Sequence, residues 1–175
     1  MNLTLQTERL ILKPFTLNDA PRVVELANDP DLARTTLNIP YPYTIDSAKD
    51  WISKHPSQIE EESVYPFAIY NQQDNRLIGT MSIRPNHRHK RGEIAYWIGK
   101  DYWGQGFATE AAKRVIKFGS DELLLNKIWA MSLTDNPGSI KVMRKVGMKK
   151  EGTLIEHFYK DRKFLDVNVY GMSLR

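Results

Sequence analysis

The sequence predicts a mixed α/β fold in which a central, mostly antiparallel sheet of seven strands carries helices on both faces. Three observations predict it. A strand-like apolar run opens the chain and is followed by two segments whose apolar residues recur with helical spacing. Three short apolar runs separated by turn-forming residues come next, which is typical of an antiparallel meander. Helical and strand patterns then alternate, and no linker rich in Pro, Gly or Ser divides the chain, so residues 1–175 are expected to form one domain.

The first third of the chain is expected to contain one strand and two helices. The strand covers residues 10–12. The first helix is capped at residues 18–19 and ends near residue 30. The second helix begins at residues 46–47, and Pro56 ends it.

The other elements follow in the order that the patterns give. Strands are expected at residues 65–70, 77–83, 93–98, 127–133, 149–158 and 164–174, and helices at about 107–119 and 137–146. Gly119 is expected to end its helix as a left-handed C-cap. The basic run at residues 84–91 lies between two strands and is interpreted as a solvated hairpin loop; the alternative is a rim that meets phosphate or an acidic substrate.

Composition and charge narrow the classes of function. Apolar residues make up 41% and charged residues 26% of the chain, which suits an ordinary globular domain. The chain has no cysteine, which excludes disulfides, thiolate metal sites and a cysteine nucleophile. Neither a membrane-spanning apolar run nor a secretory signal is present, so a cytoplasmic location is expected. The net charge of +4 favours an anionic ligand but is too small to indicate nucleic-acid binding.

A glycine-rich loop joins the strand that starts at Glu93 to the helix that follows it. Gly104 and Gly106 let the backbone turn tightly, and the free N–H groups and dipole of the first helical turn make an anion site that suits a pyrophosphate. A Rossmann fingerprint would need a third glycine where Thr109 stands, and a Walker A loop would need Gly-Lys-Ser or Gly-Lys-Thr after four intervening residues. Both of these nucleotide-binding motifs are therefore excluded.

This loop resembles motif A of the GNAT superfamily of N-acetyltransferases, Gln/Arg-x-x-Gly-x-Gly/Ala, with Gly106 and Ala108 at the last two marked positions. Trp103 at the first marked position resembles the branch of the ribosomal-protein N-acetyltransferases RimJ and RimL, where Tyr-Trp-Gly-x-Gly is common. Three further segments are similar to that branch in the same order: residues 7–12 (TERLIL), 93–98 (EIAYWI), and 136–139 (NPGS) followed by Gly-Met at 147–148. The resemblance covers nearly the whole chain.

The resemblance implies acetyl-CoA as the cofactor. In GNAT enzymes backbone N–H groups of the loop hold the pyrophosphate, and the pantetheine arm adds to the fourth strand where the sheet splays between strands 4 and 5. The cofactor-binding positions that match the family are Tyr96, Trp97, Ile98, Gly104, Gln105, Gly106, Phe107, Ala108, Thr109 and Asn136. Local pattern also makes Asn136 the N-cap of a helix with Pro137 at its first position.

The implied reaction is attack of a neutral amine on a thioester, which needs a base, stabilisation of the oxyanion and an acid for the departing thiolate. Glu93 aligns with the base that many members carry on the fourth strand; an ordinary solvent-facing Glu is the alternative. Many members use a Tyr as the acid, but that position holds Met143, and the Rim-type branch uses the Ser that matches Ser139, for which a local cap is the alternative. The same branch places an acidic base near Glu156, where the best-matching residue is Phe158.

The acceptor implied is a primary amine. A protein N-terminus of the ribosomal-protein type is expected first, and a small-molecule amine or antibiotic is the alternative, although the positive net charge disfavours a polycation such as spermidine. A CoA-binding module without catalysis is the alternative of another class, because Met143 cannot give a proton. No metal, nucleic-acid or membrane partner is expected, and a homodimer is left open. Three aromatic residues lie in the region that covers the acceptor cleft in the family: Tyr41, Tyr43 and Trp51. We interpret them first as core anchors, and recognition of the acceptor is the alternative.

Overall fold

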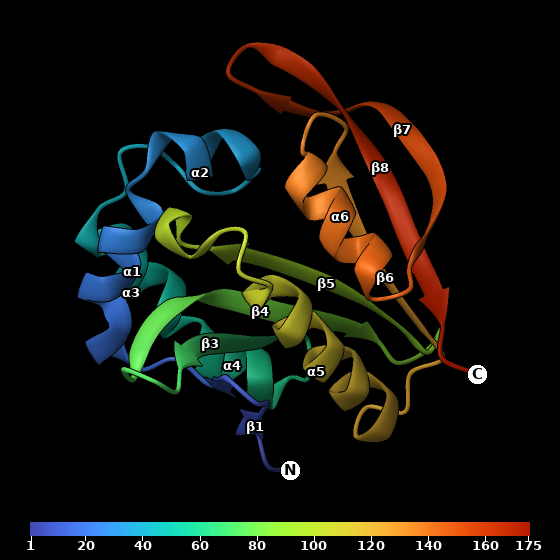
Figure 1. Ribbon diagram of the computed structural model, residues 1–175, viewed down its shortest axis with the longest axis horizontal. Coiled ribbons are helices and arrows are strands. Elements are labelled where there is room, and N and C mark those ends of the chain that lie inside the picture. Colours follow the sequence, from blue (N-terminus) through green and yellow to red (C-terminus); the bar gives the residue numbers. More distant parts are fainter.

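The computed structural model describes residues 1–175 and contains an eight-stranded sheet in the order β1-β2-β3-β4-β5-β6-β8-β7 (Figure 1). The strands are β1 Leu5–Gln6, β2 Leu10–Lys13, β3 Tyr65–Asn71, β4 Arg76–Asn86, β5 Arg91–Ile98, β6 Lys127–Leu133, β7 Lys149–Lys160 and β8 Lys163–Ser173. The helices are α1 Ala20–Ala27, α2 Pro30–Thr35, α3 Ile45–Ser53, α4 His55–Glu60, α5 Phe107–Asp121 and α6 Pro137–Lys145. Only β5 and β6 are parallel, so the predicted fold class of a mixed, mostly antiparallel sheet is confirmed.

The sheet has one strand more than the seven expected. The additional strand, β1, is two residues long and pairs Leu5 with Leu12 and Gln6 with Ile11 on β2. Two residues cannot display an alternating pattern, so only the tertiary pairing reveals this strand.

The N-terminal region has four helices where two were expected, because prolines start helices here. Pro30 lies in the first turn of α2, and Asp29 caps that helix by accepting hydrogen bonds from the N–H groups of Asp31 and Leu32. Pro56 lies in the first turn of α4, directly after α3, so it begins a new helix at the break. The missing N–H of proline costs nothing in a first helical turn.

Gly119 does not cap α5, contrary to the expectation. The helix continues to Asp121, and Gly119 is buried inside it. A Cβ atom at Gly119 would lie 2.9 Å from Cδ1 of Ile83 on β4. The absence of a side chain at Gly119 therefore allows α5 to approach the sheet closely.

The expected splay of the sheet lies between β5 and β6. These two strands pair only at Arg91–Glu93 with Lys127–Trp129, and the rest of β5 has no strand partner on that side. The wedge between the separating strands opens toward the loop that precedes α5 (Figure 1).

Two apolar clusters cover the two faces of the sheet. One is built from the central strands with α5 and α6, and the other from α1, α3 and neighbouring side chains of β3 and β4. Strand β5 contributes to both, because successive side chains of a strand alternate between faces. Ile94, Tyr96 and Ile98 face the first cluster, whereas Trp97 packs against the second.

The basic run at residues 84–91 forms the end of β4, the start of β5 and the turn between them, and all of its residues except the half-buried Pro85 are exposed. The solvated hairpin that the sequence predicts is confirmed. None of the helices is long and apolar enough to cross a membrane.

Candidate functional site

The glycine-rich loop takes the shape that its glycines allow. A 3-10 turn, Lys100–Tyr102, leads from β5 into the loop, and Gly104 and Gly106 have φ angles of +73° and +82°. Residues other than glycine rarely adopt this left-handed backbone conformation, because their Cβ atom comes too close to the following carbonyl oxygen. The two glycines therefore set the course of the loop into α5.

The backbone N–H groups of residues 104–109 donate no hydrogen bond to any protein acceptor. The first intrahelical bond of α5 runs from the N–H of Glu110 to the carbonyl oxygen of Gly106. Consecutive free N–H groups at the start of a helix combine with the positive end of its dipole to attract an anion. The loop can accordingly hold a pyrophosphate, as the sequence suggests.

Trp103, at the position where motif A has Gln or Arg, anchors this loop to the strand before it. Its Nε1 donates a hydrogen bond of 2.7 Å to the carbonyl oxygen of Ile98. The indole N–H thus satisfies a carbonyl at the point where β5 has left β6.

The three β5 residues expected to meet a pantetheine arm differ in their backbone directions. A Cβ atom at Gly79 on β4 would lie 2.4 Å from the carbonyl oxygen of Trp97, so that carbonyl is directed toward β4. Alternation along the strand then directs the backbone groups of Tyr96 and Ile98 toward the opened side. The carbonyl oxygen of Ile98 already accepts a hydrogen bond from Trp103. The N–H and carbonyl groups of Tyr96 are therefore the ones best placed to pair with an extended ligand that adds to β5 like a strand.

Ser139 is the third residue of α6 and meets a partner that the sequence analysis did not assign to it. The hydroxyl of Tyr96 lies 2.9 Å from Oγ of Ser139. Burial raises the pKa of the Tyr96 phenol, and the hydrogen bond with Ser139 opposes that shift in part. A phenol and a serine hydroxyl are therefore linked in the wedge between β5 and α6, where proton transfer can take place.

Asn136 divides its side-chain amide between two contacts. Oδ1 accepts a hydrogen bond of 3.2 Å from the N–H of Ser139, which caps α6 as the local pattern predicts. Nδ2 donates to the carbonyl oxygen of Thr35 at the end of α2, 3.3 Å away. One amide hydrogen is left for a ligand, because Nδ2 carries two.

Glu93 lies on β5 at the last residue pair before the splay, opposite Trp129 on β6 and Arg84 on β4. Burial raises the pKa of its carboxyl group, and the Arg84 charge offsets part of that rise. Strand alternation places Glu93 on the face opposite to that of Tyr96. The two candidate catalytic residues, Glu93 and Ser139, are therefore not in contact but flank the opening of the sheet from its two faces.

The remaining candidates lie outside this arrangement. Met143 is buried with 1% exposure in the apolar cluster against which Tyr96 also packs, so its side chain is part of the core. Glu156 is exposed at an irregularity of β7, where its N–H donates to Oδ1 of Asp166. Tyr43 is buried and Trp51 packs edge-on against Phe15 and His55, as expected of core anchors, whereas Tyr41 is exposed.

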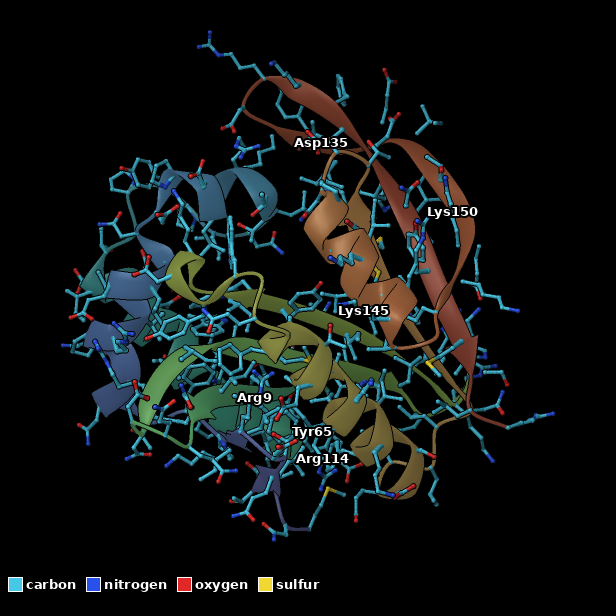
Figure 2. The ribbon with its side chains drawn as sticks, in the orientation of Figure 1. Arg9, Tyr65, Arg114, Asp135, Lys145 and Lys150 are labelled. Carbon is cyan, nitrogen blue, oxygen red and sulfur yellow. The ribbon has the colours of Figure 1, made fainter.

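The hairpin of β7 and β8 closes over the same region. Nζ of Lys160 donates to the carbonyl oxygens of Ala33 and Thr36, which lie at the end of α2. Beneath the hairpin is a groove of about 450 Å³ that includes three carboxylates, Asp135, Glu156 and Asp166. Figure 2 shows Asp135 on the loop before α6, at the end nearest the hairpin.

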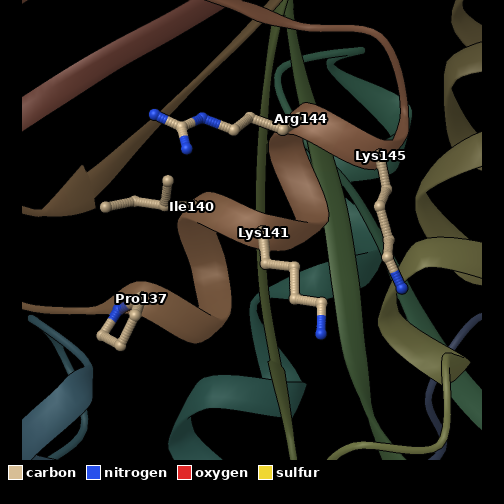
Figure 3. Close-up of a pocket in the computed structure, with 5 residues that line it drawn as sticks. All are labelled: Pro137, Ile140, Lys141, Arg144 and Lys145. Atoms are coloured by element: carbon tan, nitrogen blue, oxygen red, sulfur yellow. The ribbon is translucent and has the colours of Figure 1, made fainter.

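A second hollow of about 540 Å³ lies on the outer face of α6 (Figure 3). Its lining residues are Pro137, Ile140, Lys141, Arg144 and Lys145. The three cationic side chains have no carboxylate within salt-bridge distance. This face of α6 therefore carries a cluster of positive charge without a carboxylate partner.

Comparison with known proteins agrees with the geometry. The chain matches the acetyltransferase (GNAT) domain family over residues 9–149. It is 32% identical to the uncharacterized N-acetyltransferase p20 of Bacillus licheniformis over 174 residues, which cover 98% of this chain and 97% of that protein. It is 30% identical to the spermidine N(1)-acetyltransferase of Escherichia coli (strain K12) over 149 residues, which cover 85% of this chain and 77% of that protein.

A solved structure of RimL, a ribosomal L7/L12 alpha-N-protein acetyltransferase in complex with coenzyme A, has a TM-score of 0.89 to this chain. The alignment covers 97% of each chain at 18% identity and shows the shared fold. Because the family match spans most of the sequence and p20 aligns with it nearly end to end, the chain belongs to the GNAT family of acetyltransferases and is an N-acetyltransferase of that type.

Proposed function

We propose that the chain transfers the acetyl group of acetyl-CoA to a primary amine by direct attack of the neutral amine on the thioester. The observation that carries this proposal is the row of free N–H groups at residues 104–109, at the start of α5 and beside the unpaired part of β5. A pyrophosphate needs several convergent donors and a favourable dipole, and this row supplies both. Acetyl-CoA supplies the acetyl group as a reactive thioester.

The residues that would hold acetyl-CoA are those whose N–H or carbonyl groups have no hydrogen-bond partner within the protein. The N–H groups of Gly104, Gln105, Gly106, Phe107, Ala108 and Thr109 would bind the pyrophosphate. The backbone of Tyr96 would pair with the amide-bearing pantetheine arm, as an added strand does. Asn136 would use its remaining amide hydrogen for the same arm.

Ser139 would act as the acid for the departing thiolate. Serine alone is a poor acid for this purpose, because its alkoxide is far more basic than a thiolate. The contact with Tyr96 supports the role, since the phenol can return a proton to Ser139 as Ser139 gives its own away. No free serine alkoxide has to form along this route.

Glu93 would accept the proton of the attacking amine, directly or through water. Its raised pKa suits a general base that must be ionised near neutral pH yet basic enough to take a proton. The position on the opposite face from Ser139 also fits, because the proton taken from the amine and the proton given to the departing thiolate are then handled by two separate groups. The same position, half-buried beside Arg84, fits poorly with an ordinary solvent-facing Glu.

A protein N-terminus is the first acceptor that we propose. The β7–β8 hairpin beside the wedge exposes large apolar side chains, with Ile155 68%, Tyr159 65% and Phe164 63% accessible. Exposed aromatic and aliphatic residues grouped on one element are typical of surfaces that bind a polypeptide. RimL, which shares the fold, is an N-terminal acetyltransferase of a ribosomal protein.

A polyamine is the second candidate acceptor, because of the three carboxylates in the groove under the hairpin. Asp135, Glu156 and Asp166 would attract a cationic amine locally, despite the net charge of +4 for the whole chain. The identity to a spermidine acetyltransferase points the same way.

Release of CoA measured with a thiol reagent tests both acceptors. Because the chain has no cysteine, the enzyme contributes no thiol and all signal comes from CoA. We expect turnover with peptides that have a free N-terminus, slower turnover with spermidine, and none with N-terminally blocked peptides. Faster turnover with spermidine than with every peptide would reverse the order of the two acceptors.

Thermal unfolding with acetyl-CoA separates an enzyme from a binding module without catalysis. We expect the unfolding temperature to rise with acetyl-CoA concentration, since a ligand that binds only the folded chain stabilises it. No shift at millimolar acetyl-CoA would refute the cofactor proposal. A shift without turnover of any amine would favour the non-catalytic alternative.

A further inference from the structure

Arg9 lies just before β2, yet its side chain contacts the glycine-rich loop and the first turn of α5. Nη1 donates a hydrogen bond of 2.9 Å to the carbonyl oxygen of Gln105. The guanidinium carbon lies 4.3 Å from the centre of the Phe107 ring. A Cβ atom at Gly106 would lie 3.4 Å from Nη2 of the same side chain. Arg9 therefore lies against the loop at three consecutive residues.

The contact with Gln105 determines the direction of one of the free N–H groups. The peptide between Gln105 and Gly106 is planar and trans, so its carbonyl and its N–H point in opposite directions. Holding the carbonyl on the guanidinium therefore turns the N–H of Gly106 away from Arg9, and this N–H has no acceptor in the protein. Without that contact the peptide can rotate, and a carbonyl oxygen directed at a phosphate repels it.

Glu110 keeps Arg9 in this position. Its Oε2 accepts a hydrogen bond of 2.7 Å from Nε of Arg9, and its Oε1 accepts from the N–H of Arg9 at 2.9 Å and from Oγ1 of Thr7 at 2.6 Å. The side chain of Glu110 is 20% exposed, so the pair is partly shielded from water. The guanidinium also neutralises a carboxylate that would otherwise lower the positive potential at the start of α5.

We propose that Arg9 is a positioning residue for the phosphates of the acyl donor: it orients the Gln105–Gly106 peptide so that the loop presents its N–H groups together. This inference rests on the proposed function, because it assumes that the loop binds the phosphates of acetyl-CoA. Its effect is limited to donors that carry phosphates, since Arg9 reaches the loop and not the wedge where the thioester would lie.

The experiment compares two acyl donors, acetyl-CoA and S-acetylpantetheine, which has the same thioester and no phosphate. For Arg9→Ala we expect kcat/KM for acetyl-CoA to fall about tenfold to a hundredfold, which is the effect of losing a well-placed hydrogen bond to a charged group. Most of the change should appear in KM. The value for S-acetylpantetheine should stay unchanged.

A conservative variant and a control accompany this comparison. Arg9→Lys keeps one positive charge but lacks the planar guanidinium that bonds Glu110 and the Gln105 carbonyl at the same time. We therefore expect its kcat/KM for acetyl-CoA to lie between those of wild type and Arg9→Ala. Arg9→Lys also serves as the test if Arg9→Ala does not fold. Lys117→Ala removes an exposed ion pair with Asp121 at the other end of α5 and should leave both donors unaffected.

The outcomes separate this inference from the proposed function. An equal fall for both donors would show that Arg9 serves stability only, and an unchanged preference for acetyl-CoA in both Arg9 variants would refute the positioning role. If the wild-type enzyme does not prefer acetyl-CoA over S-acetylpantetheine, the loop does not bind phosphates, and the proposed cofactor site is wrong as well.

Discussion

The hydroxyl of Tyr96 and Oγ of Ser139 lie 2.9 Å apart and join the middle of β5 to the first turn of α6 across the wedge in the sheet. A thiol has a pKa of about 8.5 and a phenol one of about 10, whereas a serine hydroxyl is a much weaker acid than either. Burial raises the pKa of Tyr96, but the hydrogen bond with Ser139 opposes that rise, and the phenol is the more acidic of the two hydroxyl groups in the proposed route through Ser139. In the proposed route this pairing would supply the proton that a tyrosine at the position of Met143 would otherwise give.

Removing either hydroxyl should slow the chemical step. For Tyr96→Phe and Ser139→Ala we expect kcat to fall about a hundredfold, the usual effect of losing a general acid. The double variant should be hardly slower than either single one, because both groups act in one route. Steady-state kinetics at saturating acetyl-CoA measures this, with the acetyl-CoA thermal shift as a control for binding. Full turnover in both single variants would exclude the route.

The pH profile should report Glu93. Since burial raises the pKa of its carboxyl, kcat/KM should increase as pH rises through that pKa, where the base becomes ionised. Glu93→Gln should remove this acidic limb. Arg84→Ala should move it to higher pH, because the Arg84 charge lowers the pKa of Glu93.

Arg88→Ala is the matched control for Arg84→Ala, because Arg88 lies in the same hairpin and pairs with no carboxylate. The rate should be measured with one acceptor throughout, so that the pKa of the amine is constant. An acidic limb that lies below the pKa of the amine and persists in Glu93→Gln would assign the base to another residue.

Buried His55 should make the chain less stable in acid. It is 2% exposed, neither ring nitrogen has a hydrogen-bond partner, and burial lowers its pKa from 6.5 to about 4. Between these two values the unfolded chain binds the proton and the folded chain does not, so the free energy of unfolding decreases as pH falls from about 6.5 to about 4. The loss amounts to roughly 3 kcal/mol at 1.36 kcal/mol per unit.

Substitution of His55 by Phe keeps a ring between Phe15 and Trp51 and removes the titrating group. We expect His55→Phe to unfold at a higher temperature than wild type at pH 5, with a smaller difference at pH 8. Thermal unfolding at several pH values measures this. Equal pH dependence in both proteins would mean that other groups cause the acid sensitivity.

The parts of the fold and site that the sequence predicts are those set by neighbouring residues. Gly104 and Gly106 reveal the loop, and Asn136 reveals the cap of α6, because each acts within a few residues of itself. The contacts of Tyr96 with Ser139 and of Arg9 with Gln105 join residues 43 and 96 positions apart, and a local pattern carries no signal for them.

Errors in the predicted elements have the same origin. Glycine is the residue most often found at a helix C-cap, but the role of Gly119 is determined by its close approach to Ile83 on β4. Pro56 signals a helix boundary correctly, yet whether a new helix begins there depends on packing against β3. Strand β1 exists only because β2 is there to pair with it.

A pair of glycine variants can isolate what the left-handed backbone contributes to the site. A Cβ atom at Gly104 and one at Gly152 on β7 would both meet no atom within 4 Å, so neither Gly→Ala change causes a clash. The positions differ in that Gly104 has a φ of +73°, whereas Gly152 lies outside the left-handed region. Gly104→Ala should therefore cost about 1–2 kcal/mol in the loop, and Gly152→Ala should be neutral or slightly stabilising.

The cost at Gly104 should appear in cofactor binding more than in folding, because the loop can relax to another conformation that no longer presents its N–H groups together. We expect Gly104→Ala to reduce the stabilisation by acetyl-CoA, and Gly106→Val to abolish it, since Gly106 also has a φ of +82° and lies beside Arg9. Gly152→Ala should bind acetyl-CoA as wild type does. If Gly104→Ala and Gly152→Ala bind acetyl-CoA equally well, the left-handed turn is not what prepares the loop for its ligand.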